Sequence, residues 1–155
     1  MTKQPSAARA DARGLRVILL RSTFNAVVVD GLLRGAQDSL RDMGARPADV
    51  TTVDVPGAFE LPLVASVAAR SGRWDAIVAL GAVIRGETFH FEVVATESAR
   101  GILDVQLETG VPVANGVLTT ENEAQALARK DKGAEAVRVA LEMARLRQEL
   151  AAKWR

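Results

Sequence analysis

Four short apolar runs, separated by longer segments of helical periodicity, constrain the fold of this chain more than any other feature. The runs are RVILL (16–20), VTTVDV (50–55), AIVALGAVI (76–84) and VPVANGVL (111–118). They are rich in Val and Ile and lack a clean polar–apolar alternation, which is typical of strands buried on both faces of a parallel sheet. Strands that alternate with helices place helices on both sides of such a sheet. The sequence therefore predicts a three-layer α/β/α domain with a central four-stranded parallel sheet.

The first predicted helix covers about 25–44. Its apolar residues form one stripe with a period of 3.6 residues: Val29, Leu32, Leu33, Ala36, Leu40 and Met43. Asn25 can cap its start, and Gly44 can end it in a left-handed turn.

Four more helices are predicted, at about 59–71, at 90–109, at 121–129 and from 134 onward. Gly72 and Gly110 follow the first two of these segments and can stop them. Thr120 and Glu123 have the spacing of a capping box for the short helix at 121–129.

Length and charge exclude several classes of function. A chain of 155 residues predicts one domain, over 14–155, preceded by a polar, mobile arm at 1–13 that can add to a neighbour's sheet. Its net charge of +1 gives no basic field for nucleic acid or membrane surfaces. The absence of cysteine and the presence of one histidine exclude a thiol nucleophile and argue against a metal site. The N-terminus lacks the apolar core of a signal peptide, and no run could span a membrane, so we expect a cytoplasmic protein.

Ligands of open parallel sheets bind beyond the carboxyl ends of the strands. The segments that leave those ends here are Arg21–Asn25, Pro56–Glu60, Arg85–His90 and Thr119–Asn122. Phe24 could be a hydrophobic staple on the next helix or a ring that stacks on a flat heterocycle. Glu60 could be a helix-dipole partner or a ligand of the bound molecule.

The loop IRGETFH carries the densest group of polar residues. Gly86 lets the backbone approach a ligand, Thr88 supplies a hydroxyl, and the following helix start presents free amides, a combination suited to phosphate. His90 is either a structural histidine or a general acid/base with a pKa near working pH. Arg129 and Lys132 are either solvated cations at a helix end or partners of an anion. No GxGxxG or GxxxxGK[ST] motif indicates nucleotide binding.

Taken together, several longer segments resemble the lumazine synthases, the enzymes of the penultimate step of riboflavin biosynthesis. The matching segments, in chain order, are FN (24–25), LLRGA (32–36), VPGAFELP (55–62), ALGAVIRGETFHFEVV (79–94), GVLTTENEAQALAR (116–129) and KGAEAVRVALEMARL (132–146). The resemblance implies a flavodoxin-like fold and a reaction without cofactor or metal. In that reaction 5-amino-6-(ribitylamino)uracil condenses with 3,4-dihydroxy-2-butanone 4-phosphate to give 6,7-dimethyl-8-ribityllumazine, phosphate and water.

The resemblance also implies a role for each site residue. Those implied to hold the pyrimidine ring and its ribityl chain are Phe24, Asn25, Ala58, Phe59, Glu60, Val83 and Ile84. Glu87 and Thr88 would hold the phosphate, and we expect Glu87 to use its backbone N–H and not its carboxylate. His90 would transfer protons during imine formation and phosphate elimination.

The family builds pentamers with sites between adjacent subunits, and some pentamers form sixty-subunit shells. Arg129 and Lys132 would therefore reach the site of a neighbour, Arg129 toward its phosphate. Asn115 stands where family members often have a phenylalanine that closes over the ring, which implies a less apolar lid and weaker ligand binding. The stretch 129–133 is shorter than the loop usual in shell-forming members, which leaves the register of Lys132 and the assembly beyond the pentamer open.

Two other functions fit parts of the pattern. The chain could be a non-catalytic flavin-binding, lumazine-binding or shell-forming protein on the same scaffold. It could also be a flavodoxin-like carrier of FMN. The carrier is disfavoured because its phosphate loop should follow the first strand and be rich in Ser and Thr, whereas that loop here is only RSTFN.

Overall fold

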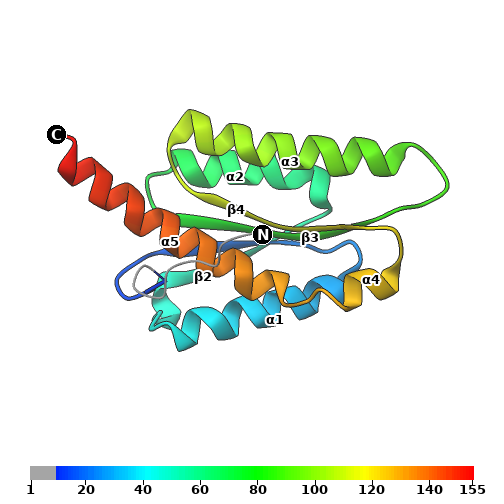
Figure 1. The fold of residues 1–155 in the computed structure, drawn as a ribbon, viewed down its shortest axis with the longest axis horizontal. Helices are drawn as coiled ribbons and strands as arrows, with labels where there is room; N and C mark the ends of the chain where they lie inside the picture. Colours follow the sequence, from blue (N-terminus) through cyan, green and yellow to red (C-terminus); the bar gives the residue numbers. More distant parts are fainter. Residues whose placement is uncertain (1–9) are drawn as a thin grey trace.

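The centre of the molecule is a sheet of four parallel strands in the order β2-β1-β3-β4, as a computed structural model of residues 10–155 shows (Figure 1). The strands are β1 (Val17–Ser22), β2 (Val50–Val55), β3 (Ala76–Ile84) and β4 (Val113–Thr120). All of β3 except its last residue is buried, because helices cover both faces of the sheet and β1 and β4 flank it. The prediction of four parallel strands from the four apolar runs is confirmed. The expected burial on both faces is wrong for β2, which lies at the edge of the sheet and has only its last residue, Val55, buried.

Helices form the two outer layers (Figure 1). They are α1 (Ala26–Asp42), α2 (Leu61–Arg70), α3 (His90–Thr109), α4 (Glu123–Leu127) and α5 (Lys132–Lys153), with short 3₁₀ turns at Pro47–Asp49 (η1) and Ala58–Glu60 (η2). One core cluster joins α1 and α5 to one face of the sheet, and a second joins α2 and α3 to the other. The predicted three-layer α/β/α, flavodoxin-like fold is therefore confirmed.

Glycines end three of the predicted helices as expected. Gly44, Gly72 and Gly110 follow α1, α2 and α3 with φ values of +94°, +72° and +72°. In this left-handed region a residue without Cβ avoids a steric penalty.

Of the two predicted N-terminal caps, Asn25 does stand at the N-cap position of α1 but makes no capping bond with its side chain, and the capping box of Thr120 and Glu123 is wrong. Asn25 precedes α1, but its side chain bonds to β3 and not to the helix amides. At α4 the cap is Asn122, whose Oδ1 accepts from the Gln125 amide at 2.9 Å. The Thr120 hydroxyl instead donates to the Asn122 carbonyl at 2.9 Å.

The chain enters the domain along the ends of α1 and α5. Ala12 is fully buried, and its amide donates to the Met43 carbonyl at 3.0 Å. The Arg145 guanidinium donates to the backbone carbonyls of Asp11 and Arg13, at 3.1 Å and 2.6 Å. Arg13 also bonds to the Asp11 carboxylate and holds the pKa of that carboxyl well below its usual range. Of the arm predicted at 1–13, residues 1–9 lie outside the described part of the chain, and so does any strand they would add to a neighbour.

None of the helices within residues 10–155 has the length and hydropathy to cross a lipid bilayer.

Candidate functional site

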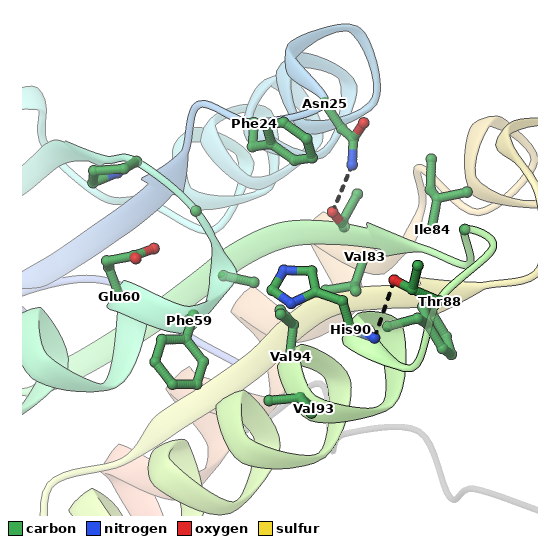
Figure 2. Close-up of a pocket in the computed structure, with 16 residues that line it drawn as sticks. Phe24, Asn25, Phe59, Glu60, Val83, Ile84, Thr88, His90, Val93 and Val94 are labelled. Atoms are coloured by element: carbon green, nitrogen blue, oxygen red, sulfur yellow. Dashed lines mark hydrogen bonds between the residues drawn. The ribbon is translucent and has the colours of Figure 1, made fainter.

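A pocket of about 500 Å³ opens beyond the carboxyl ends of β1, β2 and β3 (Figure 2). This is the position expected for a ligand of a parallel sheet, where the chain crosses from one side of β1 to the other. The pocket brings together the following predicted site residues: Phe24, Asn25, Ala58, Phe59, Glu60, Val83, Ile84, Thr88 and His90.

The wall after β1 is formed by Phe24 and Asn25. The ring of Phe24 is 70% exposed, so it does not pack as a staple under α1 and is available to a ligand. Asn25 has φ 59° and ψ 47°, a left-handed conformation that asparagine tolerates better than most residues. Its Nδ2 donates to the Ala82 carbonyl at 2.9 Å, which ties the start of α1 to β3 (Figure 2).

Substitutions of Asn25 should separate two contributions to stability, that of its left-handed backbone and that of its side-chain bond to Ala82. Asn25→Gly keeps the left-handed backbone and loses the bond to Ala82, which should cost about 1 kcal/mol of unfolding free energy. Asn25→Ala loses the bond and also strains the backbone, which should add about 1 kcal/mol. Urea denaturation at equal protomer concentration measures both values. Equal losses in the two variants would show that backbone strain makes no contribution.

The wall after β2 is the sharp turn that Pro56 and Gly57 introduce. The turn continues as η2, in which Ala58 is buried while Phe59 is 56% exposed. A Cβ on Gly57 would lie 3.1 Å from Oε2 of Glu60, so glycine lets the Glu60 carboxylate fold back toward the turn. Phe59 and Glu60 both border the pocket, Phe59 as an apolar wall and Glu60 as a hydrogen-bond acceptor (Figure 2).

The wall after β3 carries the group best suited to move protons. His90 is the first residue of α3, is exposed, and projects its imidazole into the pocket (Figure 2). Its backbone amide donates to Oγ1 of Thr88 at 3.4 Å, which leaves the hydroxyl proton of Thr88 available to a ligand. Gly86 has no neighbouring atom within 4 Å of where a Cβ would lie. Glu87 is exposed in the same loop and does not border the pocket.

The remaining predicted site residues border a different pocket of about 670 Å³, along β4 and between α4 and α5. They are Asn115, Arg129 and Lys132. Oδ1 of Asn115 accepts from the Val117 amide at 3.0 Å, and Lys132 pairs with Glu135 at 3.5 Å. A single chain thus does not bring these three residues together with His90.

Arg85 lies beside the site and was not predicted as one of its residues. It follows β3, and its guanidinium bonds to Glu92 on α3 at 2.5 Å and to Glu121 after β4 at 2.7 Å. It also lies over the Phe91 ring, 4.4 Å from the centroid. These bonds raise the pKa of Arg85 and lower that of Glu92. No local spacing could indicate the partnership with Glu121, which lies 36 residues away.

Comparison with known proteins agrees with this geometry. The family model for 6,7-dimethyl-8-ribityllumazine synthase matches residues 14–148. The chain belongs to the 6,7-dimethyl-8-ribityllumazine synthase family. It is similar to the 6,7-dimethyl-8-ribityllumazine synthases of Azoarcus sp. (strain BH72) and Methylobacillus flagellatus, each 50% identical. The matches cover 88% and 90% of this chain, and 88% and 95% of the two relatives. The lumazine synthase of Nitrosomonas europaea is 51% identical over 88% of this chain and 84% of its own length.

The region that matches the lumazine synthase family thus includes the whole sheet and the lining of the two pockets described above. The match begins just before β1 and ends within α5, so each predicted site residue lies inside it.

Proposed function

We propose that this chain is an enzyme that condenses 5-amino-6-(ribitylamino)uracil with 3,4-dihydroxy-2-butanone 4-phosphate. The products are 6,7-dimethyl-8-ribityllumazine, inorganic phosphate and water. The family membership carries this proposal, and the first pocket supports it because one imidazole, one hydroxyl and two exposed rings border a single cavity. The non-catalytic binding or shell protein is not favoured, since the similar relatives are named as synthases.

The pocket after β1, β2 and β3 binds the pyrimidine in this proposal. Phe24 stacks on the ring, and the backbone of Val83 and Ile84 contacts the ring edge. Ala58, Phe59 and Glu60 hold the ribityl chain, because a turn with free backbone groups and a carboxylate can bond to several hydroxyls. Asn25 supports this wall through its bond to β3.

The loop after β3 binds the phosphorylated butanone. Thr88 donates its hydroxyl to the phosphate, and Glu87 contributes its backbone N–H. The N-terminus of α3 follows this loop directly, and a helix dipole favours an anion at that end. His90 follows directly and carries protons between the amine, the carbonyl and the leaving phosphate.

The chemistry needs proton transfer and positioning more than a covalent nucleophile. The amine of the pyrimidine attacks the ketone, a first water leaves as the imine forms, and phosphate leaves by β-elimination. The enol that remains tautomerises to a carbonyl, and the second amine closes the ring on that carbonyl with loss of a second water. Each step moves a proton, and one positioned imidazole typically contributes about 10²–10⁴-fold. Holding two reactants together can supply a further ~7–11 kcal/mol. A chain with few reactive side chains can therefore be an effective enzyme.

Each complete site forms between two copies of the chain. The second pocket, with Asn115, Arg129 and Lys132, faces the first pocket of a neighbour, so that Arg129 reaches the phosphate and Lys132 lies near the ring. A closed ring of five copies satisfies every such interface. Light scattering should give a mass of about five chains, and a monomer at micromolar concentration would contradict the shared site.

An absorbance assay with the two synthetic substrates tests the activity directly. We expect the lumazine chromophore to appear without any added cofactor or metal. No product under conditions in which a similar relative is active would overturn the proposal. The cytoplasmic location and the single domain at 14–155 stay predictions, which cell fractionation and limited proteolysis would test.

Asn115 should weaken the binding of ring ligands. An amide in place of an aromatic ring gives a less apolar cover over the pyrimidine, and an aromatic pair is worth about 0.5–1.5 kcal/mol beyond its buried area. Asn115→Phe should therefore tighten the binding of a pyrimidine or flavin ligand by about 3–10-fold. Fluorescence titration measures this change, with Asn115→Leu as a control for apolar volume. Unchanged affinity in Asn115→Phe would show that this side chain does not cover the ring.

A further inference from the structure

Arg85 joins three segments at the carboxyl end of the sheet. Its backbone amide donates to the Thr120 carbonyl at 2.9 Å, which extends the pairing of β3 with β4 by one residue. Its side chain then bonds to Glu121 just beyond β4 and to Glu92 in the first turn of α3. One guanidinium thus fixes the spacing between β3, β4 and the start of α3.

The position of Arg85 next to Gly86 and Thr88 makes it an obvious phosphate ligand, but its contacts are against that role. Two carboxylates already occupy its donors, so the three groups together carry a net negative charge. Arg85 is also absent from the residues that border the first pocket, although Ile84 and Gly86 on either side of it do border that pocket.

The contacts of Arg85 instead converge on the two residues that follow His90. The guanidinium lies over the ring of Phe91 and bonds to the carboxylate of Glu92. Phe91 in turn borders the pocket and packs against the core between α3 and the sheet. Because His90, Phe91 and Glu92 are consecutive in the first turn of α3, holding the last two fixes the backbone from which the imidazole projects.

We propose that Arg85 is a positioning residue that orients His90, acting through Phe91 and Glu92 on one side and Glu121 on the other. The kinetic test of this inference rests on the proposed function, whereas its NMR test does not. Arginine suits the task because its planar fork can bond to two carboxylates and stack on a ring at the same time, whereas a lysine ammonium cannot do all three.

The first experiment compares the steady-state kinetics of Arg85→Met, Arg85→Lys, Glu92→Gln and Glu121→Gln. A displacement of order 1 Å in a catalytic group can cost about 10²-fold, so Arg85→Met should lower kcat by about 10–100-fold. The KM for the phosphorylated butanone should stay within about threefold, since Arg85 does not touch the phosphate. Arg85→Lys should recover only part of the loss, and each Glu→Gln variant should show a smaller loss in kcat.

Arg100 provides the matched control. It lies on α3, the helix that begins with His90, is exposed, and pairs with two acidic residues, Glu97 and Asp104, but it does not border the pocket. Arg100→Met should keep the kcat of the unchanged protein. A kcat within about twofold of normal in Arg85→Met would overturn the inference, as would full recovery in Arg85→Lys. A raised KM with an unchanged kcat would show that Arg85 is a ligand and not a positioning residue.

A second readout does not need turnover. His90 is the only histidine in the chain, so the imidazole region of an NMR spectrum reports this side chain alone. Its signal should shift and broaden in Arg85→Met and stay in place in Arg100→Met. An unchanged His90 signal in Arg85→Met would overturn the inference. A changed signal in a protein that makes no lumazine would refute the proposed function and leave the positioning role standing.

Discussion

Replacing His90 by alanine should lower kcat for lumazine formation by about 10²-fold, and by at least ~10-fold. The reason is that His90 is the one histidine bordering the first pocket, and imidazole is the side-chain group best suited to both donate and accept a proton near neutral pH. The affinity for the ring product should be almost unchanged, because Phe24, Phe59 and the backbone of β3 still hold the ring. Stopped-flow absorbance and fluorescence titration measure the two quantities separately.

Chemical rescue is the control for this variant. Imidazole added to His90→Ala should restore part of the rate, since the truncated side chain leaves room at the mouth of an open pocket. A parallel loss of affinity and rate without rescue would assign His90 a binding role. An unchanged kcat in the alanine variant would exclude His90 as the proton carrier.

Replacing Gly133 by alanine should cause the largest loss of stability. Gly133 lies in the first turn of α5 against the backbone of α1, and a Cβ there would lie 2.1 Å from the Leu32 carbonyl oxygen. The contact is with a helix backbone that cannot move aside, so the cost should be about 3 kcal/mol or more. For a chain of this length, that lowers Tm by about 6–12 °C in a thermal melt. The shift of α5 should also displace Lys132, the adjacent residue.

Gly35→Ala is the matched control on the same pair of helices. Gly35 lies inside α1, and a Cβ there would have its nearest neighbour, the Lys130 carbonyl oxygen, at 3.7 Å, an ordinary contact. Alanine should therefore stabilise the helix by about 0.5–1 kcal/mol. Similar melting temperatures for the two variants would show that the helices separate without cost, contrary to the close packing described here.

The fold could be predicted because its signals are local. Each strand contains a short run rich in Val, Ile, Leu or Ala, and the longer helices have a periodic apolar face, so the identity of the elements follows from short windows of sequence. The side-chain bond of Asn25 could not be predicted for the opposite reason, because its partner is distant in sequence. The amide of Asn25 could bond to α1 or to the Ala82 carbonyl 57 residues away, and only the folded structure brings the second partner within reach.

The first pocket could be predicted in part from the topology. Loops that leave neighbouring parallel strands meet at one end of the sheet, which is why Phe24, Glu60 and His90 border one cavity. The resemblance to a family was needed to assign them roles. Arg85 escaped prediction because its contacts depend on how β3, β4 and α3 lie in space.

The separation of His90 and Arg129 onto two pockets has a genetic consequence. A chain lacking His90 and a chain lacking Arg129 would each assemble with complete folds and defective sites. Mixed in the ring proposed above, the two would create interfaces in which an intact His90 faces an intact Arg129. With equal amounts and random assembly, about one site in four should be whole. Two inactive alleles of this protein would then complement each other, which is possible only when no subunit works alone.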